Sequence, residues 1–153
     1  MPSIGVADRW RLDIDEQHGT ASYADPAVAL VRHAMVADTG ERGARSFSPW
    51  HDDVVWRIPG TTAFSETWAG REGILAYRRL LARLSDDTIR QRLISLEGSQ
   101  SAMVAAYLRT TAVRGGRRLD IPTLLNFELG EGRIRTVTEL PGDRAAWDRF
   151  WSD

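Results

Sequence analysis

Apolar residues recur with helical spacing in three segments of the chain. The clearest is residues 71–84, where apolar positions three or four residues apart alternate with arginine and glutamate, which predicts an amphipathic helix. An earlier helix is predicted between Asp25 and Gly40, because Asp25 suits an N-cap, Pro26 suits the first helical position and Gly40 follows the last periodic residue. A short terminal helix is predicted after Asp143. Its apolar side would consist of Trp147, Phe150 and Trp151.

The other apolar segments are short and lie between turn residues, which is typical of strands. They are residues 54–58, 88–96, 102–113, 119–129 and 134–140. The glycine pair in Arg114-Gly115-Gly116-Arg117 predicts a hairpin. The order of helix, strand, helix, antiparallel strands and helix predicts an α+β domain, with helices on one face of a curved sheet.

The start of the chain does not share this periodicity. Residues 1–24 are polar and are interpreted as an N-terminal arm or tail, from which Trp10 and Leu12 would dock onto the rest. Residues 25–153 then form a single domain, in keeping with a length of 153 residues.

Composition removes several functional classes. The chain has 20 Lys and Arg against 21 Asp and Glu, so its net charge of -1 favours neither nucleic acid nor an anionic membrane as a partner. It has no cysteine and no secretory signal, which suits a cytoplasmic protein. Its 3 histidines lack metal-ligand spacing, and phosphate-loop and dinucleotide motifs are absent. A reaction without metal or cofactor, or simple binding, is therefore expected.

Three stretches resemble a known family. "HDDVVWRIPG", "WAGREGILAYRRLL" and "RRLDIPTLLNFELGEGRIRTVTELPGDRAAWDRFW" are similar to the SnoaL-like group of the nuclear transport factor 2-like superfamily. The resemblance implies a cone-shaped curved antiparallel β-sheet wrapped around helices, a small apolar molecule in the cone, and a homodimer formed through the outer sheet face. Relatives include ketosteroid isomerases, limonene epoxide hydrolases and polyketide cyclases, together with domains that have no known reaction.

Chemistry in an apolar cone needs an acid or base whose pKa the apolar walls displace. Glu139, in "TVTELPG", lies where the epoxide hydrolases and cyclases of this group place a catalytic aspartate, so it is the leading acid/base candidate. The alternative is an outward or ion-paired carboxylate, with Arg57 or Arg109 as partner.

Arg57 and Ile58 argue against steroid isomerase chemistry. The resemblance implies that ketosteroid isomerases carry their base just before the proline of this motif, where this chain has Ile58. Arginine stays protonated at neutral pH and cannot be a general base. Arg57 is therefore a candidate for binding a substrate oxygen or for pairing with Glu139 across the cone.

Three further polar residues are candidates for the same site, each with a simpler alternative. Asn126 could orient a water or donate to an oxyanion, or it could be an outward residue of an alternating strand. Asp120 could be a second carboxylate in the cone, or it could form a solvated pair beside Arg117 and Arg118. His33 could donate into the pocket or carry a proton, or it could bond to a neighbouring loop.

Aromatic residues supply the candidate substrate contacts, although buried aromatics more often belong to the core. These candidates are Trp56, Phe64, Trp68, Tyr77 and Tyr107. The sequence thus favours a small-molecule-binding domain, either a cofactor-independent isomerase, cyclase or hydrolase of an apolar carbonyl or epoxide, or a ligand-binding or dimeric assembly domain without a reaction. A module that binds a partner protein through the outer sheet and residues 1–24 is a weaker third hypothesis.

Overall fold

The computed structural model of the chain describes residues 12–14, 25–37, 49–62, 64–99 and 102–153. Seven strands form one sheet in the order β1-β4-β5-β6-β7-β2-β3. The strands are β1 (Leu12–Ile14), β2 (Trp50–Arg57), β3 (Thr67–Ala69), β4 (Arg90–Gly98), β5 (Met103–Arg114), β6 (Arg117–Gly130) and β7 (Arg133–Pro141). The helices are α1 (Pro26–Ala37), α2 (Gly70–Leu84) and α3 (Arg144–Trp151).

The first and last helices begin where their capping residues predict. The Asp25 carboxylate accepts a hydrogen bond from the Ala27 amide at 2.9 Å, directly before α1. The Asp143 side chain accepts from the Ala146 amide at 2.9 Å and caps α3. Because both side chains satisfy amides of a first helical turn, local chemistry alone fixes these two starts.

The sheet differs from the predicted one in two ways. β2 pairs in parallel with β7, and β1 pairs in parallel with β4, so the sheet is mixed rather than purely antiparallel. A short strand, β3, also forms within residues 59–69, where no strand was predicted, and it pairs antiparallel with β2. The arm interpretation of residues 1–24 therefore includes an edge strand, while Trp10 lies outside the described residues.

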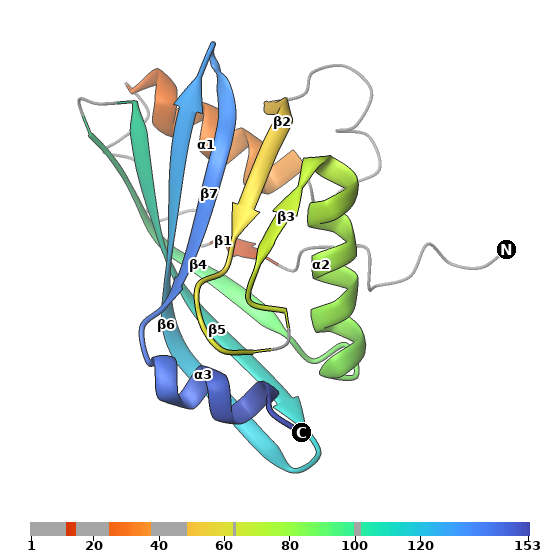
Figure 1. The fold of residues 1–153 in the computed structure, drawn as a ribbon. Helices are drawn as coiled ribbons and strands as arrows, with labels where there is room; N and C mark the ends of the chain where they lie inside the picture. Colours follow the sequence, from red (N-terminus) through yellow and green to blue (C-terminus); the bar gives the residue numbers. More distant parts are fainter. Residues whose placement is uncertain (1–11, 15–24, 38–48, 63, 100–101) are drawn as a thin grey trace, which may run out of the picture.

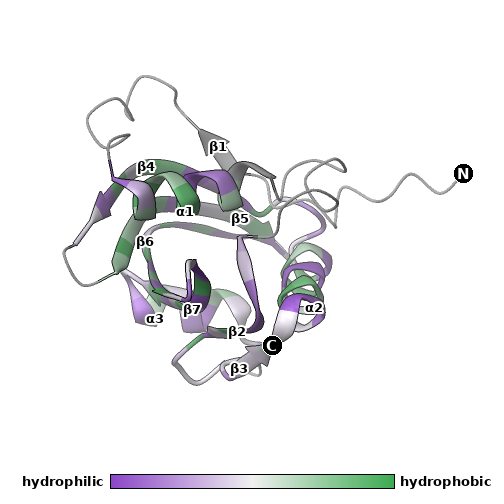
Figure 2. Cartoon of the chain, turned by 90° about the horizontal axis from the view of Figure 1, so that it is seen from above, coloured by the Kyte–Doolittle hydropathy of each residue, from purple (hydrophilic) through white to green (hydrophobic). Residues whose placement is uncertain are grey.

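The helices lie against different parts of a strongly curved sheet (Figure 1). α1 contacts β4 and β5, α2 contacts β2 and β3, and α3 contacts β6. Seen from above, the sheet curls round the interior and α2 lies at its open side (Figure 2). This arrangement confirms the predicted α+β fold with a curved sheet. None of the described helices is both long and apolar enough to span a membrane.

Strand alternation separates an inner face from an outer face. On β6 the inner side chains are Ile121, Thr123, Leu125 and Phe127, all of which are buried. On the outer face Tyr107, Leu124 and Leu140 are register partners across β5, β6 and β7, and they are half-buried or exposed. The phase of each strand therefore decides which polar residues reach the interior.

Candidate functional site

Glu139 is the one carboxylate among the buried polar residues of the described chain. It lies on β7 opposite Leu125 of β6, faces inward, and is 1% exposed. Its Oε1 accepts hydrogen bonds from the Tyr77 hydroxyl at 2.6 Å and from the Trp56 indole Nε1 at 3.2 Å. Its Oε2 accepts from Gln91 Nε2 at 3.3 Å. Three neutral donors therefore surround a carboxylate that is shielded from water.

These donors come from three elements that are distant in the sequence. Trp56 lies on β2 beside β7, Tyr77 is on the buried side of α2, and Gln91 is on β4 at the other end of the sheet. Only a sheet that curls back on itself lets β4 and β7 contribute to one cluster. The cluster continues along β5 and β6. Gln91 Nε2 also donates a hydrogen bond to the Thr110 hydroxyl at 3.2 Å. The Thr110 hydroxyl is in turn hydrogen-bonded to the Thr123 hydroxyl at 2.7 Å.

The environment raises the pKa of Glu139. Burial is the largest cause, because it removes the water that would solvate the charged form. Four neighbours lower the pKa and so offset part of this increase: the hydrogen-bond donors Tyr77, Trp56 and Gln91, and the positive charge of Arg78. Burial also raises the pKa of the Tyr77 hydroxyl well above its usual value, and the neighbouring Glu139 raises it further. Tyr77 is therefore a permanent hydrogen-bond donor in this cluster.

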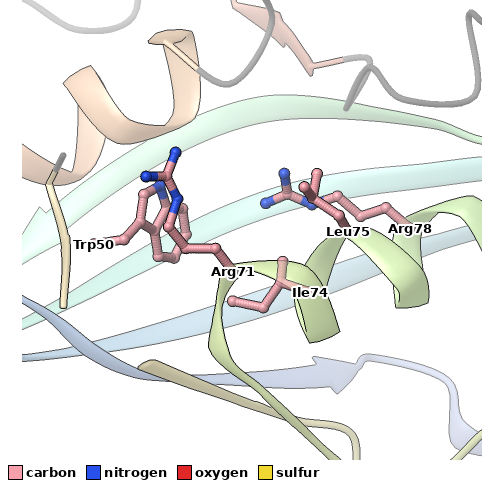
Figure 3. Close-up of a pocket in the computed structure, with 5 residues that line it drawn as sticks. All are labelled: Trp50, Arg71, Ile74, Leu75 and Arg78. Carbon is pink, nitrogen blue, oxygen red and sulfur yellow. The ribbon is translucent and has the colours of Figure 1, made fainter. Parts of the chain in front are cut away.

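Arg78 links the Glu139 cluster to a small pocket beside α2. Its guanidinium carbon lies 5.6 Å from the centroid of the Trp56 ring, a cation–π distance. The pocket has a volume of about 40 Å³ (Figure 3), and its lining residues are Trp50, Arg71, Ile74, Leu75 and Arg78. Arg78 thus belongs both to this pocket and to the charged surroundings of Glu139.

A larger groove of about 650 Å³ lies between α2, α3 and the segment around β3. Phe64 and Trp68 line this groove and also contact Tyr77, with ring centroids 6.0 and 5.6 Å away. Glu139 lines neither this groove nor the small pocket. The aromatic rings therefore separate the large groove from the carboxylate.

Arg57 and Asn126, two of the predicted partners of Glu139, lie on the other face of the sheet. Arg57 is exposed, and its register partner on β7 is Thr138, which is itself paired with Asn126 of β6. Trp56 and Glu139, one position away on each strand, point inward instead. The predicted pairing of Arg57 with Glu139 across the cone is therefore not formed, and the alternative of an outward Asn126 agrees with the structure.

Asp120, His33 and Tyr107 also lie away from the Glu139 cluster. Asp120 is exposed and accepts a hydrogen bond from Arg109 Nε at 2.6 Å, which lowers the pKa of its carboxyl group. This agrees with the predicted solvated pair, except that the partner comes from β5 rather than from the hairpin end. His33 is exposed on α1, and Tyr107 is 41% exposed on the outer face. Strand alternation corrects the interpretation of Tyr107 as a pocket residue.

The four remaining aromatic candidates do gather near Glu139. Trp56, Phe64 and Trp68 surround Tyr77, with ring centroids 5.6 to 6.2 Å from its ring. They form one continuous aromatic cluster that packs against the carboxylate through Tyr77 and Trp56. This placement suits both predicted roles, pocket lining and core.

Three residues of the Glu139 cluster and of the pocket beside α2 were missed from the sequence. Gln91 shares a face with buried Leu93, and this alternation was a usable signal. Arg78 follows Tyr77 on α2 and therefore lies at the edge of the apolar stripe rather than opposite it. Trp50 lies outside the strand predicted over residues 54–58, but it begins β2 and is buried.

No combination of three or more His, Cys, Asp or Glu residues within the described ranges is arranged to hold a metal ion. The donors around Glu139 are an indole, a phenol and an amide. These groups can support acid/base chemistry by a carboxylic acid that is hydrogen-bonded to neutral donors.

Comparisons with known proteins agree on the fold. No model of a protein family matches the chain. Uncharacterized proteins of Mycobacterium tuberculosis and Mycobacterium bovis are 27% identical to it over 128 residues, which cover 84% of this chain and 98% of theirs.

Solved structures are similar over the same extent. Bal32a, from a soil-derived mobile gene cassette, is 27% identical with a TM-score of 0.73, covering 84% of this chain and 98% of its own. A putative SnoaL-like polyketide cyclase from Jannaschia sp. is 14% identical with a TM-score of 0.61, covering 84% and 93%. Proteins described as nuclear transport factor 2-like, or as having a ketosteroid isomerase-like fold, also match. The chain therefore has the fold of the nuclear transport factor 2-like superfamily and of its SnoaL-like group, as its sequence motifs predicted.

Proposed function

We propose that the chain binds a small molecule with an apolar body and a carbonyl or epoxide oxygen, and that Glu139 exchanges a proton with it. The observation that carries this proposal is a buried carboxylate whose pKa is raised by loss of water and whose neighbours are neutral donors. A raised pKa brings a carboxyl group closer to the working pH, where proton transfer in both directions is efficient. The reaction class is an isomerisation, cyclisation or hydrolysis without cofactor.

Within the carboxylate, Oε2 is the atom suited to carry the proton. Oε1 already accepts from both Tyr77 and Trp56, whereas Oε2 accepts one long hydrogen bond from Gln91. A carboxylate offers about two lone pairs on each oxygen, so one site remains on Oε2. Because Glu139 is 1% exposed, a ligand reaches Oε2 only where the side chains that cover it move aside.

The cation that would polarise a substrate oxygen is Arg78 rather than Arg57. Arg78 acts on Glu139 electrostatically and lies over Trp56, whereas Arg57 lies on the outer face. A guanidinium held beside an aromatic ring keeps its charge and its planar set of donors. Arg78 thus takes over the oxygen-binding role that the sequence assigned to Arg57.

A ligand-binding or assembly domain without chemistry is the second candidate. The observation in its favour is that all three donors around Glu139 are satisfied and that neither described cavity reaches the carboxylate. A fully bonded buried carboxylate can serve to hold β2, α2 and β4 together.

The two candidates differ in the effect of Glu139→Gln on turnover. We expect the wild-type protein to accelerate deuterium exchange next to the carbonyl of an apolar bicyclic ketone such as α-tetralone, or the hydrolysis of styrene oxide. Glu139→Gln keeps the shape of the side chain but cannot carry the proton, so the acceleration should fall by about 10²–10⁴-fold. Proton NMR measures both reactions.

Asp120→Asn is the matched control, because it also neutralises a carboxylate but on the exposed face. It should react like the wild type. Equal rates for the wild type and Glu139→Gln would reject Glu139 as the acid/base and leave the binding domain without chemistry.

We also propose that two copies of the chain associate through the outer face of the sheet. The register row Tyr107–Leu124–Leu140 crosses β5, β6 and β7, and both Tyr107 and Leu140 are exposed large apolar side chains. Ile94 adds a further exposed apolar side chain from β4. An apolar row of this kind is typical of a surface that another protein covers.

Tyr107→Glu is expected to convert the dimer into a monomer, because a charge within the apolar row would be buried at the interface without a partner. Sedimentation velocity measures the change. Val113→Glu, on the same strand but nearer the hairpin, should leave the dimer intact. A wild-type protein that sediments as a monomer would contradict the proposal.

A further inference from the structure

The pocket beside α2 combines two arginines with an apolar surface. Arg71, Ile74, Leu75 and Arg78 have the spacing i, i+3, i+4 and i+7, so they lie along one side of the helix. Both guanidinium groups extend to the same side of α2, and Trp50 faces Arg71 from the start of β2 (Figure 3). Two cations therefore border a space whose other walls are aliphatic or aromatic.

Arg71 is placed where a cation destabilises a helix. It lies in the first turn of α2, at the positive end of the helix dipole, and Ala69 at the N-cap contributes no side-chain hydrogen bond. Among the described residues Arg71 has no ion-pair or hydrogen-bond partner. A second cation, Arg78, lies two turns further on the same side. Arg71 is therefore the cation of this pocket that an added anion would stabilise most.

We propose that this pocket binds the carboxylate group of an organic acid, which is the molecule on which Glu139 acts. The inference rests on the proposed function, because it names the class of ligand for that site. A volume of about 40 Å³ exceeds the roughly 10–15 Å³ that a cavity needs in this measure to hold one water, so the few atoms of a carboxylate group fit. The planar donor sets of arginine match the two oxygens of a carboxylate.

The apolar lining suits the carbon next to the acid group. Trp50 is buried, Ile74 is buried and Leu75 is half-buried, so the carbon chain of the acid has apolar contacts as it leaves the arginines. Arg78 belongs both to the pocket and to the surroundings of Glu139. An acid held by Arg78 therefore has the Trp56 ring and the Glu139 cluster as its neighbours.

The test compares an acid with its neutral amide. Phenylacetate and phenylacetamide are titrated into ¹⁵N-labelled full-length protein, and the Nε–Hε signals of Arg71 and Arg78 are followed by NMR. We expect saturable shifts of both signals with phenylacetate, and binding of phenylacetamide weaker by about tenfold or more, as for the loss of charge-assisted hydrogen bonds. Arg71→Gln and Arg78→Gln should each weaken the binding of phenylacetate by a similar factor and abolish the preference over the amide.

Arg83→Gln, an exposed residue near the C-terminal end of α2, is the control and should leave both affinities unchanged. Arg71 is exposed, so its replacement tests the pocket without disturbing the core even where Arg78→Gln affects Trp56 packing. Three results would overturn the inference: equal binding of acid and amide, no saturable shift with phenylacetate, or shifts of equal affinity with inorganic phosphate.

Glu139→Gln separates this inference from the proposed function. The variant keeps both arginines, so it should retain the preference for phenylacetate over phenylacetamide even if Glu139 plays no part in turnover. A wild-type protein that shows no preference for phenylacetate over phenylacetamide would reject the carboxylate pocket. Unchanged turnover in Glu139→Gln would reject only the acid/base role of Glu139.

Discussion

Trp147→Ala should lower the free energy of unfolding by about 3–5 kcal/mol, as for other large aromatic side chains removed from a core. Trp147 is 0% exposed and anchors α3. Its ring lies 6.1 Å from Phe64 at 84° and 5.6 Å from Trp151, both edge-on contacts. With 8 residues, α3 is too short to be stable without such packing.

The loss should appear as a lower denaturant midpoint in urea, measured by circular dichroism of the sheet. Trp147→Phe is the matched variant, because it keeps an aromatic ring in the same place, and it should lose less than half as much stability. The hydrogen bonds from Arg117 to the last carbonyl groups of α3 remain in both variants. An Ala variant within about 1 kcal/mol of the wild type would show that the aromatic contacts of α3 add little to the folded state.

The elements with local signals were predicted correctly from the sequence. The apolar stripe of residues 71–84 became α2, the glycine pair at 115–116 became the β5–β6 turn, and Asp143 became the N-cap of α3. The parallel pairing of β2 with β7 was not predicted, because periodicity within a strand does not indicate which distant strand lies beside it. β3 was missed for a related reason. It has 3 residues, too few for alternation to be recognised.

An interior position for Glu139 was anticipated from the sequence, but the side chains that surround it were not. Glu139 was selected by its place in the last strand, and the structure places it in the interior. Arg57 was assigned to the interior although Trp56, one position earlier, is the inward residue. A shift of one position moves a strand side chain to the opposite face of the sheet. A family motif that does not show which residues of the strand point inward therefore cannot distinguish an inward Arg57 from an outward one. Gln91 and Arg78 come from other elements, and only the curvature of the sheet brings them to β7.

Raising the pH should destabilise the wild-type protein relative to Glu139→Gln. Because the pKa of Glu139 is higher in the folded state than its usual value of 4.5, the folded protein holds this proton at a pH where the unfolded chain has released it. The resulting stabilisation is fully present below the unfolded pKa and is lost as the pH rises through the folded pKa. The glutamine side chain of the variant does not titrate. The difference should therefore change by about 1.4 kcal/mol for each unit that separates the two pKa values.

Urea unfolding of both proteins between about pH 4 and 8 measures this difference. Its direction decides between two descriptions of the site. If burial dominates, the free energy of unfolding of the wild type minus that of Glu139→Gln falls as the pH rises. If the donors Tyr77, Trp56 and Gln91 and the charge of Arg78 dominated instead, the folded pKa would lie below the unfolded one and the difference would rise. Asp120→Asn provides the opposite sign within the same protein, because Arg109 lowers the pKa of Asp120, so its stabilisation is present at neutral pH and lost in acid. A falling difference means that the carboxylate is held ready to bind a proton, which an acid/base needs, whereas a rising one means that it is held as an anion to join three elements of the fold.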